Sequence, residues 1–85
     1  MPENHETVRK TILELVKKRG PGKTICPSDA ARLLASEERE WRALMPQVRE
    51  VADKLAQAGE IIVTQKGKQV DIVQAKGPVR LGLKT

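Results

Sequence analysis

The sequence predicts an α+β fold in which three helices are followed by a small antiparallel β-hairpin. Two amphipathic helical patterns occupy the first half of the chain, and a third covers roughly residues 46–58 until Gly59 ends it. Directly after this glycine, residues 61–65 are β-prone and lead into a turn at residues 66–68 that carries two lysines. Three helices followed by a basic hairpin is the chain order of a winged helix-turn-helix domain, so we expect that architecture, with the hairpin as its wing.

The chain is expected to form one domain without a membrane segment. Its 85 residues, 39% of them hydrophobic, can enclose one core, which we place in residues 7–85, while residues 1–6 are polar and predicted to be flexible. No apolar run approaches the roughly 20 residues of a membrane span, and no signal-peptide pattern opens the chain. The lone Cys26 cannot form an internal disulfide, so the expected location is the cytoplasm.

The first helix is predicted from a single apolar stripe. Its members lie at i, i+4, i+7 and i+8 and are Val8, Ile12, Leu15 and Val16. Asn4 is the expected N-cap and Gly20 the residue just beyond the last turn, where Pro21 prevents continuation. Leu13 lies off the stripe, and we expect it to contact the C-terminal segment or a second subunit.

The second helix is predicted to begin at Pro27, which suits the first helical position. A short β-prone stretch at residues 23–25 precedes it, and Cys26 occupies the capping position as a small, half-buried residue. A reactive thiol is the alternative at Cys26, but no basic residue is adjacent in sequence to activate it. The packing face of this helix is expected to consist of Ala30, Ala31, Leu33 and Leu34.

The third helix is expected to begin at Pro46, because proline disfavours the α conformation of the residue before it and so predicts a break at Met45. Residues 36–45 then form a separate, acidic helical turn. Trp41, the one aromatic residue, lies in this turn, and we interpret it as a core anchor rather than a base-stacking platform. The buried stripe of the third helix comprises Val48, Val51, Ala52 and Leu55.

The hairpin continues beyond its turn. Residues 69–70 are predicted to return as a strand, and residues 71–77 to form a loop. Residues 79–83 alternate between apolar and other residues, which is typical of a final strand.

The chain contains no complete motif for catalysis or metal binding, because the required residues are wrongly spaced or too few. Residues 20–24 (Gly-Pro-Gly-Lys-Thr) resemble the end of a phosphate-binding loop, but Lys17 stands where that motif requires a glycine, and a helix precedes it where a strand is needed. One histidine and one cysteine offer no metal-ligand spacing, and Cys26 has no histidine base nearby in sequence. Carboxylate pairs fall on exposed helical faces. We therefore expect no enzyme, no cofactor and no metal.

The positive charge is concentrated near the two ends of the chain. The formal net charge is +5; residues 27–60 carry five basic and seven acidic side chains, whereas residues 61–85 carry five basic and one acidic. This predicts phosphate contact from the hairpin and its loop through Lys66, Lys68, Lys76 and Arg80, with a second cluster at Lys17, Lys18 and Arg19. The second cluster is equally explained as favourable cations at a helix C-terminus. On the third helix, Glu50 and Asp53 occupy the outer face, so weaker contacts are expected from Gln47, Arg49 and Lys54.

Four blocks of sequence resemble one protein family. They are Gly-Pro-Gly-Lys-Thr-Ile-Cys-Pro-Ser at residues 20–28, Trp-Arg-Ala-Leu-Met-Pro at 41–46, Val-Thr-Gln-Lys-Gly at 63–67 and Gly-Pro-Val-Arg-Leu at 77–81. Their order is similar to that of small bacterial proteins catalogued as domain of unknown function 3253, and the resemblance extends from about Val8 to Leu83. It implies a winged-helix fold and a bacterial origin, and it brings no known activity, ligand or catalytic residue.

Two functions of different classes follow from these observations. The first is a transcription-associated protein that binds duplex DNA through backbone contacts from the basic hairpin. The second is a protein-interaction or dimerisation module without nucleic-acid binding, suggested by the acidic face of the third helix and by Leu13. Stacking of single-stranded bases is disfavoured, because the chain has no Phe and no Tyr.

Overall fold

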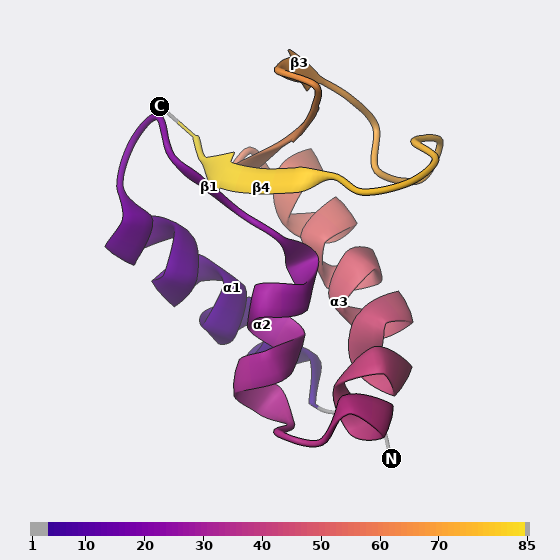
Figure 1. Ribbon diagram of the computed structural model, residues 1–85. Helices are drawn as coiled ribbons and strands as arrows, with labels where there is room; N and C mark the ends of the chain where they lie inside the picture. Colours follow the sequence, from indigo (N-terminus) through magenta and orange to yellow (C-terminus); the bar gives the residue numbers. More distant parts are fainter. Residues whose placement is uncertain (1–3, 85) are drawn as a thin grey trace.

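The computed structural model describes residues 4–84, and these contain three helices and a four-stranded antiparallel sheet (Figure 1). The predicted α+β class is confirmed. In chain order the elements are α1 (His5–Arg19), β1 (Thr24–Ile25), α2 (Pro27–Leu34), α3 (Glu38–Gln57), β2 (Ile61–Gln65), β3 (Lys68–Gln69) and β4 (Arg80–Leu83). The sheet lies across one end of the helical layer, and α2 stands between α1 and α3 in the view of Figure 1.

The sheet has the strand order β1-β4-β2-β3, so β1 and β3 form its two edges. The last strand, β4, is therefore central: Leu81 lies opposite Ile25 of β1 on one side and opposite Val63 of β2 on the other. All three of these side chains are buried against the helices. Gly82 follows on the other face, where an added Cβ would lie 3.3 Å from Thr24 Cγ2, so glycine allows β1 to pack closely against β4.

Both ends of α1 are capped as predicted. The Asn4 side chain accepts a hydrogen bond from the Glu6 backbone N–H at 2.7 Å, and Gly20 ends the helix with a φ of 89°. His5 and Glu6, which the sequence assigns to a flexible end, form the first turn of the helix. Residues 1–3 of that predicted flexible end lie outside the described residues.

The buried face of α1 follows the predicted stripe, whereas α2 departs from its prediction at one position. Val8, Ile12 and Val16 are fully buried, and Leu13 and Leu15 are half-buried side chains that pack against the core. Ala30 and Ala31 are fully buried on α2, but Leu33 is 67% exposed, so its assignment to the packing face is wrong. The reason is helical geometry: at 100° per residue Leu33 lies roughly 110° from the centre of the buried face, too far to reach the core.

The predicted break at Met45 is also wrong, because α3 runs without interruption from Glu38 to Gln57 with Pro46 inside it. Pro46 lies on the exposed face, so the carbonyl four residues earlier, which loses its N–H donor, is open to water. Leu44 and Val48, on either side of the proline, are buried. Their packing holds the helical conformation that the local preference of Met45 disfavours.

The core is built almost entirely from aliphatic side chains. The fully buried residues with the largest side chains are Ile12, Ile61, Leu81, Val8, Val16, Val48, Val63 and Val79. The predicted stripe of the third helix (Val48, Val51, Ala52 and Leu55) is buried as expected. Trp41 is only half-buried and packs at the edge of this core, so it is not the central anchor that was expected. Two guanidinium groups lie over its ring, with Arg32 at 4.7 Å and Arg42 at 4.9 Å from the ring centroid.

The hairpin has a two-residue turn. Lys66 and Gly67 both have positive φ values, 54° and 81°, which is the conformation of a type I′ turn. Lys68, predicted to belong to the turn, instead begins β3 and lies opposite Gln65. The return strand is short, and residues 70–79 form the long loop that leads to β4. Ile72 in this loop is 5% exposed and extends the core beyond the sheet.

Candidate nucleic-acid interface

The exposed end of the hairpin gathers three lysines, Lys66, Lys68 and Lys76, which we call the hairpin lysines. Lys66 and Lys68 flank the turn glycine, and Lys76 belongs to the long loop. Gln65 joins the two segments, because its side-chain amide donates hydrogen bonds to the carbonyl oxygens of Lys76 at 2.6 Å and of Pro78 at 3.1 Å. All three lysines are exposed, and none of them forms an ion pair within residues 4–84. This end of the sheet therefore presents uncompensated positive charge.

Arg80 is the fourth residue of this region that is predicted to contact DNA, but its guanidinium forms hydrogen bonds within the fold. Its Nε donates to Thr24 Oγ1 at 2.9 Å and its Nη2 to the Thr24 carbonyl oxygen at 3.1 Å. Its Nη1 donates to Cys26 Sγ at 2.7 Å. The half-buried guanidinium thus joins β4 to β1 and to the start of α2, and few of its donors remain for a ligand.

Cys26 occupies the N-cap of α2, as the sequence predicts, and its half-buried side chain fits the small-cap interpretation. The cap is closed by the backbone and by Asp29: the Cys26 N–H donates to the Asp29 carboxylate at 2.9 Å, and the Asp29 N–H donates to the Cys26 carbonyl at 2.9 Å. The sequence did not reveal Arg80 beside the thiol, because the two are brought together only by pairing of β1 with β4.

The second predicted cluster, Lys17, Lys18 and Arg19, forms the exposed last turn of α1. Residues 20–23 lead from there into β1, one edge of the sheet, whereas Lys66 lies in the hairpin turn and Lys68 in β3, at the other edge. Three strand spacings of about 4.8 Å separate those edges by about 14 Å. The two clusters are therefore separate surfaces, and the position of the first also suits the negative end of the α1 dipole.

The residues of α3 that are predicted to contact DNA interact with other residues of the fold. The Arg49 Nη2 donates to the Ile72 carbonyl oxygen at 3.5 Å, and Lys54 Nζ lies 3.8 Å from Glu50 Oε1. Gln47 is half-buried. Glu50 and Asp53 lie among these residues, so the outer face of α3 carries two carboxylates, in agreement with the acidic face that the sequence predicts.

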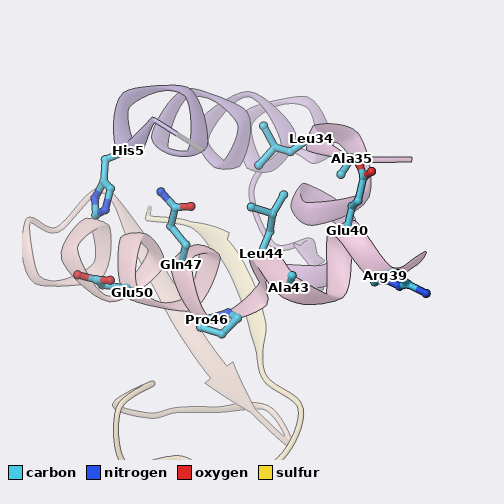
Figure 2. Close-up of a pocket in the computed structure, with 10 residues that line it drawn as sticks. All are labelled: His5, Leu34, Ala35, Arg39, Glu40, Ala43, Leu44, Pro46, Gln47 and Glu50. Atoms are coloured by element: carbon cyan, nitrogen blue, oxygen red, sulfur yellow. The ribbon is translucent and has the colours of Figure 1, made fainter. Parts of the chain in front are cut away.

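A hollow of about 940 Å³ opens between α3 and the neighbouring ends of α1 and α2 (Figure 2). Its charged groups lie at two ends, His5 and Glu50 at one and Arg39 and Glu40 at the other, with Leu34, Ala43 and Leu44 between them. Both signs of charge are therefore present in the lining, with Arg39 beside Glu40 at one end and Glu50 at the other. It also contains no serine, threonine or cysteine that could act as a nucleophile among its lining residues.

The described part of the chain offers neither a metal site nor a membrane span. Residues 4–84 contain no group of three His, Cys, Asp or Glu side chains placed to hold a metal ion. None of the helices in this range combines the length and apolarity that a membrane span requires.

Comparison with protein families matches residues 5–84 to the family described as "Protein of unknown function (DUF3253)". The match covers nearly the whole chain and agrees with the resemblance carried by the four sequence blocks. Comparison with curated proteins finds no match.

Proposed function

The chain belongs to the DUF3253 family, and we propose that it is a winged-helix protein that binds duplex DNA through phosphate contacts from its hairpin lysines. The order of elements supports this architecture: helix, short strand, two helices, then a hairpin that leads to a last strand. The adjacency of β1, β4 and β2 supports it further, since it places the hairpin at the free edge of the sheet, where a wing projects.

The observation that carries the proposal is the gathering of the hairpin lysines at one exposed end of the sheet. The two hydrogen bonds from Gln65 hold the Lys76 backbone beside the hairpin, so the position of this residue does not depend on a free loop. Lysine is a mobile point charge suited to phosphate oxygens, and a contact to phosphate carries no sequence information. The expected binding is therefore sequence-tolerant and strongly dependent on salt.

In this proposal α3 makes little contact with base edges. Glu50 and Asp53 on its outer face would repel phosphates, and Arg49 donates a hydrogen bond to the Ile72 carbonyl oxygen. Three phosphate contacts correspond to modest affinity, with a dissociation constant on the order of 10⁻⁴–10⁻⁶ M at physiological salt. A transcription-associated role then requires help from a partner or from local concentration on DNA.

The experiment compares two double variants with the same change in charge. Fluorescence anisotropy with a labelled duplex at about 50 mM salt is measured for Lys66→Glu/Lys68→Glu and for Lys17→Glu/Lys18→Glu. We expect the first pair to weaken binding about tenfold or more on every duplex sequence tested, and the second about threefold or less. Equal losses would contradict the assignment to the hairpin, as would a larger loss from Arg49→Ala than from the hairpin pair.

A further inference from the structure

A second, smaller hollow of about 540 Å³ lies between α3 and the loop of residues 70–79, which passes beside this helix in Figure 1. We call it the α3 groove. One wall is a single face of α3, with residues spaced as i, i+1, i+4, i+5 and i+8, and the other wall is a short stretch of the loop. The lining residues are Met45, Pro46, Arg49, Glu50, Asp53, Ile72, Val73 and Ala75.

The loop side of the α3 groove displays an apolar side chain on a fixed backbone. Ile72 is 5% exposed and anchors the loop, whereas its neighbour Val73 is 72% exposed. Asp71 fixes this stretch: its carboxylate accepts the Val73 N–H at 2.9 Å, and its carbonyl oxygen accepts the N–H groups of Gln74 at 3.1 Å and Ala75 at 2.9 Å. Val73 is thus held outwards by a hydrogen-bonded turn, and a partner would not have to order it.

The helix side of the α3 groove is negatively charged at its rim. Glu50 and Asp53 both line it, while the one basic lining residue, Arg49, donates to the Ile72 carbonyl oxygen at the base of the loop. The ion pair between Glu50 and Lys54 is long, at 3.8 Å, and both side chains are more than half exposed. Such a pair is weak, so a basic side chain of a partner can replace Lys54 beside Glu50 at little cost. Two carboxylates against one guanidinium give the lining a formal charge of −1, opposite in sign to the net charge of +5 of the whole chain.

We propose that the α3 groove docks a short segment of a partner protein that carries aliphatic anchor side chains flanked by lysine or arginine. The apolar floor, with the adaptable thioether of Met45, accommodates the anchors. The carboxylates of Glu50 and Asp53 select basic flanks, which the positive charge of the rest of the molecule would otherwise repel. This site is separate from the hairpin lysines, and its occupation does not depend on DNA binding.

The probe is a synthetic amphipathic peptide of about four helical turns, with leucines along one face and lysines beside them. A matched peptide replaces every lysine by glutamate. Both are titrated, without DNA, into isotope-labelled protein, and amide chemical shifts are followed by NMR. We expect saturable shifts at Met45, Arg49, Val73 and Ala75 with the lysine peptide, and affinity at least tenfold lower for the glutamate peptide.

Two matched variants locate the binding. Val73 and Leu33 are the two exposed large hydrophobic residues within residues 4–84, so Val73→Asn, which adds no charge to the groove, is compared with Leu33→Asn on α2. We expect Val73→Asn to weaken binding about tenfold or more and Leu33→Asn to leave it within about twofold. Because both positions are exposed, both variants should remain folded, as their NMR spectra will show. Glu50→Lys/Asp53→Lys should reverse the preference between the two peptides.

Four results with the peptides would overturn the proposal. They are an absence of saturable shifts with the lysine peptide, equal affinity for both peptides, equal effects of the two asparagine variants, and shifts confined to the hairpin lysines. Groove shifts that grow with protein concentration in the absence of peptide would overturn it too, since the occupant would then be a second copy of this chain.

Discussion

Replacing Arg80 by methionine distinguishes a structural arginine from one that contacts DNA. Methionine keeps an unbranched apolar stem but has no guanidinium, so the side-chain hydrogen bonds from Arg80 to Thr24 and Cys26 disappear. Thr24 lies in the edge strand β1, which consists of two residues and is paired with β4 alone. The structure therefore predicts that Arg80→Met loosens β1 and the start of α2.

The size of the effect follows from the hydrogen bonds that are lost. The two bonds to Thr24 oxygen atoms, at 2.9 and 3.1 Å, contribute about 0.5–1.5 kcal/mol each, and the sulfur contact adds less. We expect the free energy of unfolding to fall by about 1–3 kcal/mol. For a domain of this size a loss of about 2 kcal/mol lowers Tm by about 8–16 °C.

Urea denaturation followed by circular dichroism measures this fall in the free energy of unfolding. A double-mutant cycle with Thr24→Val shows how much of it comes from the hydrogen bond between Arg80 and Thr24. Thr24→Val removes the hydroxyl acceptor of the Arg80 Nε. We expect a coupling energy of about 0.5–1 kcal/mol between the two substitutions. Arg80→Lys, which keeps the charge and loses the planar fork, should be nearly as destabilising as Arg80→Met.

The opposite pattern would refute this role of Arg80. If Arg80→Met leaves the midpoint of denaturation unchanged while DNA affinity falls as far as in Lys66→Glu/Lys68→Glu, the guanidinium contacts DNA and does not stabilise the fold. Rescue of DNA affinity by Arg80→Lys would strengthen that contrary conclusion, because a phosphate contact needs the charge and not the fork.

Three further predictions concern single positions. Pro46→Ala restores an N–H donor inside α3 and should raise the free energy of unfolding by about 1–3 kcal/mol in chemical denaturation; an unchanged or lower value would contradict a continuous helix. Gly67→Ala places a side chain at a φ of 81° and should cost about 1 kcal/mol by the same measurement, and a neutral effect would count against the type I′ turn. The hydrogen bond from Arg9 lowers the pKa of the Glu6 carboxyl. Since the folded pKa lies below the unfolded one, its stabilising effect is present above the unfolded pKa of about 4.3 and is lost as pH falls through the folded value. NMR titration should show that Arg9→Gln raises the Glu6 pKa, and an unchanged pKa would contradict the contact.

The parts of the fold that the sequence predicts correctly are those set by local chemistry. Asn4 and Gly20 mark the ends of α1, Pro27 begins α2, and Gly59 ends the third helix, because capping and backbone conformation depend on a few neighbouring residues. The three helices, the hairpin and the last strand follow from such signals together with apolar periodicity.

The errors arise where tertiary packing outweighs a local preference. Pro46 predicts a helix break, yet burial of Leu44 and Val48 keeps α3 continuous. Trp41 is the largest apolar residue, and its predicted place in the core is taken by aliphatic side chains while two arginines cover its ring. Neither outcome can be deduced from neighbours in sequence.

The candidate sites depend even more on contacts that are distant in sequence. Charge counting identifies Lys66 and Lys68, but it cannot show that Arg80 is bonded to β1 or that Gln65 holds the Lys76 backbone beside the hairpin. The α3 groove has only a faint signal, the adjacent apolar residues at 72–73 in a predicted loop. The turn at Asp71 and the position of α3 determine that Ile72 is buried and Val73 exposed.

Binding of duplex DNA by the hairpin lysines is tested most directly by the salt dependence of wild-type affinity. Fluorescence anisotropy of a labelled duplex is measured between about 50 and 200 mM salt, and the logarithm of the association constant is plotted against the logarithm of salt concentration. Up to three phosphate contacts predict a slope of about −2 to −3, and a slope of −2.7 means an affinity loss of about 40-fold over this range. Absence of binding at about 50 mM salt, or binding whose strength does not change with salt, would contradict the proposed function.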